Sequence, residues 1–284
     1  MKSIIIAGAT GGIGQSLVRD YLAQGYCVGL VARNADRLNA LSETLKKQNK
    51  ENQFYMACKN VSNPDEVKTL FKQHQEKTGS SPDVLLNLVG QQAPMGLTWK
   101  VSPEKWIDAI QQNLAPAFLL THEAINQALS SNKPCSLIHF SGGGAAYARA
   151  YFSAYGCSKT ALLRLVETAA LELKEQSLSD LIQINAMAPG AIHTNMTQEI
   201  LAAGKAGVGE KALLEAEETT ANESNASLIK VVNLCRYLSD RKQNAGISGK
   251  LIHVNESYQT WGEQVKELNQ SDWGLLRRVN LRGE

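Results

Sequence analysis

Short apolar runs alternate along the chain with longer stretches in which apolar side chains recur every three or four residues. The short runs are rich in Ile, Val and Leu and are apolar at almost every position, which predicts β-strands buried on both faces. The expected strands are 3–7, 27–31, 54–58, 84–88, 137–140, 182–187 and 250–254. The stretches between them have the period of amphipathic helices, with long ones at 103–130 and 155–175. This alternation predicts an α/β fold in which a doubly wound parallel sheet carries helices on both faces.

A glycine-rich segment joins the first expected strand to the helix that follows it. It reads Gly8-Ala9-Thr10-Gly11-Gly12-Ile13-Gly14. Glycines suit a backbone that must turn sharply and approach a pyrophosphate, whose charge then rests on the helix N-terminus. The position of the segment, between a strand and a helix, therefore predicts a dinucleotide site.

The end of the second expected strand bears on which dinucleotide is bound. Ala32 and Arg33 stand 18 and 19 residues after Gly14, near the point where a carboxylate usually holds the ribose hydroxyls. A cation without a carboxylate suits a 2′-phosphate, so we expect NADP(H). The alternative is that Arg33 is a solvated residue on the turn.

Tyr155 and Lys159 are four residues apart at the start of the long helix expected at 155–175. This spacing places both side chains on one helix face. An ammonium ~4 Å from the phenol would lower the pKa of Tyr155 by about 3 units, which suits acid–base catalysis near neutral pH. The alternative is an exposed helix pair with no chemical role.

Taken in order, these motifs resemble the short-chain dehydrogenase/reductase family from about residue 1 to residue 254. The residues that carry the resemblance are Gly8, Gly12, Gly14, the Asn-Leu-Val-Gly segment at 87–90, Asn113, Ser141, Tyr155, Lys159, Pro189 and Gly190. The resemblance implies a single-domain Rossmann-type fold and hydride transfer between NAD(P) and a ketone or secondary alcohol.

The resemblance also implies roles for individual side chains. Tyr155 would pass the proton, Ser141 would hydrogen-bond the substrate oxygen, and Lys159 would bind ribose hydroxyls while lowering the phenol pKa. Asn113 would hold a water in the proton relay. The residues implied in cofactor binding are Gly8, Thr10, Gly12, Ile13, Gly14, Arg33, Asn60, Val61, Asn87, Gly90, Tyr155, Lys159, Pro189, Gly190, Ile192 and Thr194.

Several positions depart from the family pattern. Ser141 lies 14 residues before Tyr155, one more than is usual, and Gly142 occupies the ungapped position. Ser141 is still the expected hydroxyl, since the glycines at 142–144 could absorb a one-residue bulge. Asn60 stands where an Asp is usual, so an amide would recognise the adenine.

The domain organisation follows from the same pattern. Residues 1–255 are expected to form one dinucleotide-binding and catalytic domain, in which the polar, acidic segment 196–228 is a substrate lid. Residues 256–284 are expected to form a C-terminal extension packed on the same domain. The long helices at 103–130 and 155–175 predict a homodimer, and a homotetramer stays open because the family's usual ending after Val254 is altered.

Composition narrows the range of partners. The chain has 29 Lys and Arg against 27 Asp and Glu, a net charge of +2, which argues against nucleic acid or an anionic membrane. No apolar run approaches the ~20 residues of a membrane span. Five cysteines that are never spaced CxxC, and five dispersed histidines, argue against a disulfide framework and a metal site. We therefore expect a cytoplasmic protein that holds no metal.

The sequence thus predicts an NADP(H)-dependent oxidoreductase that acts on a small carbonyl or secondary alcohol. One alternative is a 3-oxoacyl thioester reductase acting on acyl carrier protein, which is disfavoured because that partner is acidic and the lid segment is acidic as well. The other alternative is a catalytically idle NADP-sensing protein. The presence of Asn113, Ser141, Tyr155 and Lys159 together argues against it.

Overall fold

Seven parallel strands form one sheet in the residues that the computed structural model describes, which are 1–48, 53–222 and 225–277. The strands are β1 (Ser3–Ala7), β2 (Cys27–Ala32), β3 (Phe54–Cys58), β4 (Val84–Asn87), β5 (Cys135–Phe140), β6 (Ile182–Ala188) and β7 (Leu251–His253). Their order is β3-β2-β1-β4-β5-β6-β7, so the winding direction reverses between β1 and β4. Ligands of doubly wound sheets bind at such a reversal, beyond the carboxyl ends of the strands. The predicted fold class is confirmed, and the predicted strand ends differ by one or two residues.

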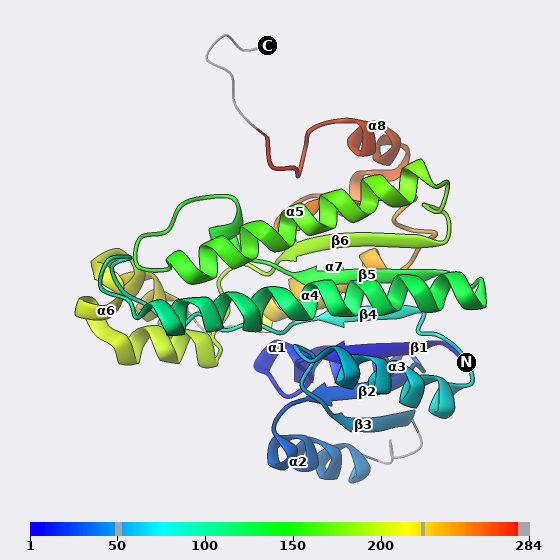
Figure 1. Ribbon diagram of the computed structural model, residues 1–284, viewed down its shortest axis with the longest axis horizontal. Helices are drawn as coiled ribbons and strands as arrows, with labels where there is room; N and C mark the ends of the chain where they lie inside the picture. Colours follow the sequence, from blue (N-terminus) through cyan, green and yellow to red (C-terminus); the bar gives the residue numbers. More distant parts are fainter. Residues whose placement is uncertain (49–52, 223–224, 278–284) are drawn as a thin grey trace.

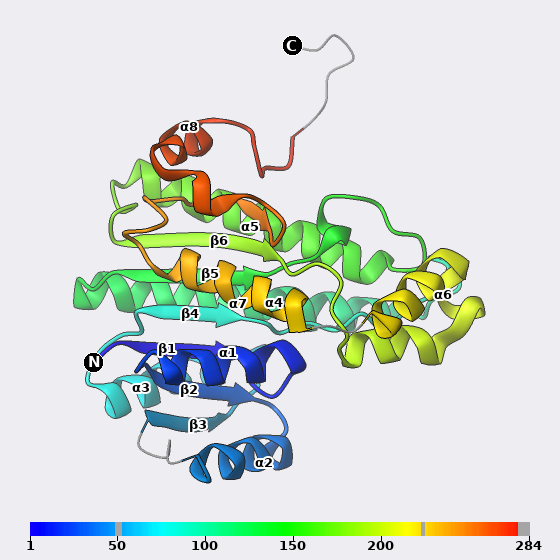
Figure 2. The ribbon, with the colours of Figure 1, turned by 180° about the vertical axis from the view of Figure 1, so that it is seen from behind.

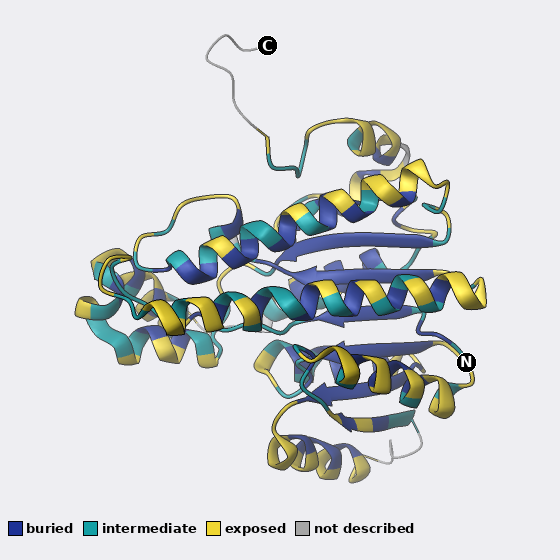
Figure 3. Ribbon diagram, in the orientation of Figure 1, coloured by how far each residue is buried: buried dark blue, intermediate teal, exposed yellow. Residues whose placement is uncertain are grey.

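Helices cover both faces of the sheet (Figures 1 and 2). The α-helices are α1 (Gly12–Ala23), α2 (Ala35–Lys46), α3 (Pro64–Thr78), α4 (Pro103–Ser131), α5 (Ser153–Glu175), α6 (Asn195–Ala221), α7 (Asn225–Ser239) and α8 (Val265–Gln270). Short 3₁₀ segments are η2 (Gly143–Ala145), η3 (Tyr258–Thr260) and η4 (Gly262–Gln264). Helices α3, α4 and α5 pack on one face, while α1, α2 and α7 pack on the other. The strands are consequently buried almost throughout (Figure 3), as their apolar sequences predict.

Local capping signals fix where several helices begin. The Asn63 side chain accepts hydrogen bonds from the backbone N–H groups of Asp65 and Glu66, and Pro64 occupies the first turn of α3. The side chain of Ser102 likewise caps α4, which also opens with a proline. Side-chain oxygens that satisfy free N–H groups, followed by proline, are strong helix starts.

The segment expected as a lid lies beyond the carboxyl ends of the strands, where Figure 1 shows α6. Helix α6 is interrupted at Gly204 (φ 61°) and Gly209 (φ 77°), conformations that favour glycine. At Gly209 a side chain would also collide with Tyr151, since a Cβ would lie 2.6 Å from its ring. The predicted boundary at residue 228 falls inside α7, whose apolar face packs against the core beside α1.

The C-terminal extension covers the β7 edge of the sheet. The N–H of Leu251 donates to the carbonyl of Gly274 at 2.8 Å, and Lys250 Nζ donates to the Ser271 carbonyl at 2.7 Å. Further along, the Leu276 N–H donates to Glu167 Oε1 on α5 at 2.6 Å. The extension therefore occupies hydrogen-bonding groups that an edge strand would otherwise leave open. Residues 278–284 of the predicted extension lie outside the described residues.

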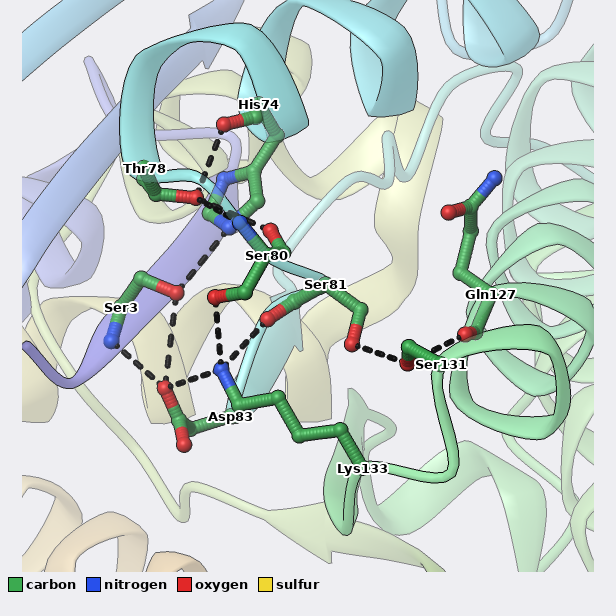
Figure 4. A network of polar contacts seen from close by, with 9 residues as sticks. All are labelled: Ser3, His74, Thr78, Ser80, Ser81, Asp83, Gln127, Ser131 and Lys133. Atoms are coloured by element: carbon green, nitrogen blue, oxygen red, sulfur yellow. Dashed lines mark hydrogen bonds and ion pairs between the residues drawn. The ribbon is translucent and has the colours of Figure 1, made fainter.

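A buried polar network ties together the amino ends of the strands (Figure 4). Asp83 Oδ2 accepts from the Ser3 N–H at 2.7 Å and from Lys133 Nζ at 3.0 Å. The His74 ring, fully buried, lies 3.0 Å from Ser3 Oγ and 2.8 Å from the Tyr55 hydroxyl. These contacts connect β1, β3, α3 and the segments flanking β4 and α4 at the end of the sheet opposite α6.

Candidate active site

The glycine-rich turn between β1 and α1 has the shape that a pyrophosphate requires. Gly8 has φ +92°, and a Cβ on Gly14 would lie 2.2 Å from the Gly8 carbonyl oxygen. No side chain fits between these two backbones, which explains the glycines physically. The predicted residues Gly8, Thr10, Gly12, Ile13 and Gly14 lie on this turn and the first turn of α1. The geometry of this turn therefore fits the pyrophosphate of a dinucleotide.

Arg33 lies just after the carboxyl end of β2, and its side chain is exposed. Its Nη1 donates to Gln112 Oε1 on α4 at 2.9 Å, and the same oxygen lies 3.3 Å from Ser62 Oγ. Asn60 stands nearby after β3, and its Oδ1 accepts from the Ser62 N–H at 3.1 Å. Gln112 was not predicted from the sequence, because it is far from Arg33 along the chain and only the tertiary fold brings the two side chains together.

Asn113 and Lys159 converge on Gly90, after the end of β4. A Cβ on Gly90 would lie 3.1 Å from Lys159 Nζ and 3.4 Å from Asn113 Oδ1. The Asn113 side chain is fully buried and pairs with the Gln91 main chain in both directions, at 2.8 and 3.0 Å. Lys159 Nζ donates to the Phe140 carbonyl at the end of β5, at 2.8 Å. Side chains from α4 and α5 thus meet between the carboxyl ends of β4 and β5.

Tyr155 lies one turn before Lys159 on α5, and its hydroxyl forms no hydrogen bond with any described residue. Burial raises the pKa of Tyr155 to about 12, although the Arg149 charge opposes this. Burial lowers the pKa of Lys159 to about 8. The prediction that Lys159 lowers the phenol pKa stays a prediction. The ammonium lies 5.8 Å from the phenol ring centroid and is bound to main chain, so desolvation dominates.

Ser141 and Gly142 follow β5 directly. The Ser141 N–H donates to the Met187 carbonyl at 2.8 Å, and its Oγ is buried without a hydrogen-bond partner among the described residues. A Cβ on Gly142 would lie 2.8 Å from the Tyr155 hydroxyl oxygen. The position that faces the phenol is therefore Gly142, and the catalytic role of Ser141 stays a prediction.

The segment between β6 and α6 returns to the glycine-rich turn. Thr197 Oγ1 accepts from the Thr194 N–H at 3.3 Å and donates to the Ile192 carbonyl at 3.0 Å, which fixes the first turn of α6. Thr194 Cγ2 would lie 3.7 Å from a Cβ on Gly12. The predicted residues Pro189, Gly190, Ile192 and Thr194 all belong to this segment. The segment thus lies beside the start of α1.

Comparison with known proteins agrees with this geometry. Residues 2–205 match the model of a family described as short chain dehydrogenase. The chain belongs to the short-chain dehydrogenase family. It is therefore an oxidoreductase of the kind that uses a nicotinamide cofactor.

Three similar proteins illustrate the family. The chain is 28% identical over 257 residues to 3-oxoacyl-acyl-carrier-protein reductase FabG of Staphylococcus epidermidis, covering 89% of this chain and 97% of that protein. Levodione reductase has a TM-score of 0.76 at 17% identity, covering 93% of this chain and 98% of its own. A structure of ElxO with NADP bound has a TM-score of 0.73 at 21% identity, covering 90% and 98%. At these identities the two solved structures support the fold.

In this short-chain dehydrogenase a buried histidine positions a predicted cofactor residue. Asn87 Oδ1 accepts from the Val89 N–H at 3.1 Å, so its Nδ2 donates to His139 Nδ1 at 3.1 Å. The other ring nitrogen of His139 then donates to Thr121 Oγ1 at 2.9 Å. Burial lowers the pKa of His139 to about 3, so the ring is neutral. This role could not be predicted from the sequence, since His139 is not part of a motif with a characteristic spacing.

Two features of the described residues bear on the partners of this dehydrogenase. No described helix is long and apolar enough to cross a membrane. Within the same residues, no group of three or more His, Cys, Asp or Glu side chains is arranged to hold a metal ion.

Proposed function

We propose that this dehydrogenase is an NADP(H)-dependent oxidoreductase that interconverts a small carbonyl compound and its secondary alcohol. The observation that carries the proposal is the meeting of Asn113 and Lys159 at Gly90, with Tyr155 one turn before Lys159 on α5. Asn113 and Lys159 come from two different helices, yet they converge between the carboxyl ends of β4 and β5, where Lys159 donates to the Phe140 carbonyl. A structural role alone gives no reason to bury a lysine and a phenol together at this point.

The chain's own residues provide the proton chemistry, while a bound nicotinamide would supply or accept the hydride. The Tyr155 hydroxyl donates its proton to the carbonyl oxygen in reduction and would take up a proton from solvent by way of a water that Asn113 holds. Lys159 uses one of its three N–H donors to bind the Phe140 carbonyl, so two N–H groups remain to bind ribose hydroxyls. We keep Ser141 as a predicted member of the site.

The preference for the 2′-phosphate rests on Arg33. Its guanidinium is exposed at the carboxyl end of β2 and donates to an uncharged amide, Gln112, which a phosphate could replace. The NADP found in the ElxO structure supports the same choice. The other residues proposed to hold the cofactor are Gly8, Thr10, Gly12, Ile13, Gly14, Asn60, Val61, Asn87, Gly90, Pro189, Gly190, Ile192 and Thr194.

The surroundings of the phenol favour a substrate with uncharged, apolar groups. An apolar cluster, the lid cluster, joins Tyr155 and Phe152 to α6 and consists of Phe152, Tyr155, Ile200, Val208, Ala212 and Ala216. The relative FabG supports the alternative of a 3-oxoacyl thioester on acyl carrier protein. Helix α6 carries five Glu against two Lys, however, and this excess would repel an acidic carrier.

The outer faces of α4 and α5 support a homodimer. Large apolar side chains are exposed there, namely Ile107, Phe118, Leu129 and Leu171. Such residues mark association surfaces when they share one face. We propose a homodimer, with a homotetramer as the other possibility, working in the cytoplasm, where the five cysteines, all free in this structure, stay reduced.

The proposal is tested by following NADPH consumption with a panel of ketones, in wild type and in Tyr155→Phe. The substitution removes only the transferable proton, so turnover should fall by ~10²–10⁴-fold while the NADPH dissociation constant stays nearly unchanged. Wild-type binding of NADPH without turnover on any ketone or alcohol would favour an NADP-sensing protein. A near-wild-type rate in Tyr155→Phe would remove Tyr155 from the mechanism.

A further inference from the structure

The loop after β4, residues 91–96, is fixed at both of its ends. At the first end the Gln91 N–H donates to Asn113 Oδ1 at 2.8 Å, and Asn113 Nδ2 donates to the Gln91 carbonyl at 3.0 Å. At the other end the Gly96 N–H donates to the Tyr151 carbonyl at 2.8 Å. These hydrogen bonds hold the loop between α4 and the segment that leads into α5.

Gln92 is buried in this loop with an unpaired oxygen. The residue is 9% exposed, and its Oε1 has no hydrogen-bond partner among the described residues. An acceptor that has lost its water without gaining a partner is costly, so such a group needs an explanation. Met95, in the same loop, packs against the lid cluster, which includes Tyr155. Gln92 therefore belongs to the loop that borders the phenol.

We propose that Gln92 is a specificity-determining residue whose Oε1 accepts a hydrogen bond from a hydroxyl group of the substrate. The unpaired atom is an acceptor, so the group that matches it is a donor. The Lys159 ammonium stands close to Gly90, two residues before Gln92, and would repel a positively charged donor. An uncharged hydroxyl group meets both conditions.

The substrate class is therefore a hydroxyketone, and its reduction yields a diol. The ketone group faces the phenol of Tyr155, while the hydroxyl group pairs with Gln92. This inference rests on the proposed function, because it names the substrate of the same site. A substrate without the hydroxyl group would leave Oε1 unpaired in the complex, and a site of this kind rejects such analogues strongly.

Two substitutions of glutamine by methionine form a matched pair. Gln92→Met keeps the length of the side chain and removes the acceptor. Gln53 also has a buried Oε1 without a partner among the described residues, but it precedes β3, at the end of the sheet opposite the site. Gln53→Met therefore makes the same chemical change away from the substrate.

The experiment measures steady-state kinetics with NADPH in the wild-type full chain and in both variants. Each substrate pair is a hydroxycyclohexanone and the methylcyclohexanone with its substituent at the same ring position, because a methyl group has nearly the volume of a hydroxyl group. We expect the wild type to favour the hydroxyl member of at least one pair roughly 10- to 100-fold in kcat/KM. In Gln92→Met this ratio should fall to within about threefold, through loss of activity on the hydroxyketone alone. Gln53→Met should keep the wild-type ratio.

The other kinetic outcomes overturn the proposal. It fails if the wild type turns over the methyl ketones and prefers no hydroxyl member, or if the preference survives in Gln92→Met. Equal losses on both members of a pair in Gln92→Met would show a structural role for Gln92. A change of the ratio in Gln53→Met as large as that in Gln92→Met would also contradict the proposal.

Binding and stability measurements separate this proposal from the proposed function. If the wild type turns over no carbonyl compound, the proposed function fails, and saturation-transfer NMR with the same pairs and NADPH-loaded protein decides the role of Gln92. Binding of a hydroxyl member that is lost in Gln92→Met supports that role, and its absence overturns it. Gln92→Met should melt no lower than the wild type, since it removes an unpaired buried oxygen. A Tm lower by several degrees, or a variant that does not fold, would show that Oε1 serves the fold and would overturn the proposal.

Discussion

At the scale of single residues, burial sets the protonation of the two titratable side chains at the centre of the site. A phenol whose pKa is raised to about 12 stays protonated throughout the neutral range. It therefore carries the proton that reduction of a carbonyl requires, although the raised pKa makes it a weaker acid than a free tyrosine. The lowered pKa of Lys159, about 8, still leaves the ammonium mostly charged at pH 7.

Arg33 should carry most of the preference for NADPH over NADH. Replacing Arg33 by Ile and Ala32 by Asp removes the cation and adds a carboxylate that repels the 2′-phosphate. The ratio of the two dissociation constants should move toward NADH by roughly 30- to 150-fold, with kcat spared. Arg37→Ile is the matched control one helical turn away, and it should move the ratio much less. A wild type that already prefers NADH would remove Arg33 from the phosphate site.

At the scale of elements, α6 is held to the rest of the chain by contacts near the phenol. Arg149, from the loop before α5, lies 3.1 Å from Glu215 on α6 and stacks 4.2 Å from the Phe152 ring centroid. The same loop supplies Tyr151, which packs on the break at Gly209. The lid cluster and this ion pair together place α6 over the site.

Breaking the Arg149–Glu215 pair should loosen α6 without unfolding the protein. Both partners are partly exposed, so the pair adds only ~0–1 kcal/mol to stability. In Glu215→Gln we expect KM for the carbonyl substrate to rise about two- to fivefold and Tm to change by no more than a degree or two. Glu210→Gln is the control, because Glu210 pairs with Lys205 inside α6. Equal kinetic effects in both variants would argue against a latch between α6 and the loop.

At the scale of the whole molecule, the C-terminal extension closes an edge that the parallel sheet leaves open. Tyr258, Trp261 and Val265 are buried in the core, so a chain cut after Asn255 would lose core packing as well as the edge contact. A chain cut after Gln270 keeps those side chains and loses the part that bonds to β7 and α5, together with Trp273, whose ring lies 4.8 Å from that of Trp261. The second cut therefore tests the edge contact with a smaller loss of core packing.

Removing residues 271–284 should increase self-association through β7. The N–H of Leu251 loses its partner at Gly274, and an unpaired edge strand pairs readily with another chain. Sedimentation velocity should give a dimer for the full chain and a larger species for the shortened one. A full-length monomer would contradict the dimer, and an unchanged dimer after truncation would contradict the edge-covering role.

Two buried histidines should make the fold sensitive to acid. Burial lowers the pKa of His74 to about 4 and that of His139 to about 3, so the folded state binds fewer protons than the unfolded chain below pH 6.5. Their contribution is complete above about pH 6.5 and is lost as pH falls from there toward these values, at about 1.4 kcal/mol for each histidine per pH unit. Denaturant titrations between pH 7.5 and 4 should show a shallower decline in His74→Gln and His139→Gln. The exposed His122→Gln should keep the wild-type decline.

The sequence by itself determined the fold class, the strand positions and the glycine-rich turn. These features depend on local and periodic signals, namely apolar runs, helix caps and glycines between a strand and a helix. Tyr155 and Lys159 were also visible, because their spacing is a property of one helix. The ends of the strands were predicted only to within one or two residues. Contacts such as the hydrogen bond from the Val89 N–H to the Asn87 side chain contribute to where a strand ends.

Tertiary structure alone decided the electrostatics and the neighbours of the site. The phenol pKa depends first on burial, to which the apolar side chains of α6 contribute, and then on the Arg149 charge, and neither is encoded in the Tyr–Lys spacing. The same holds for Gly142, whose closeness to the phenol joins the end of β5 to α5, and for His139, which supports Asn87 from the next strand. Desolvation and contact between distant segments arise only when the chain packs, so no pattern along the sequence reports them.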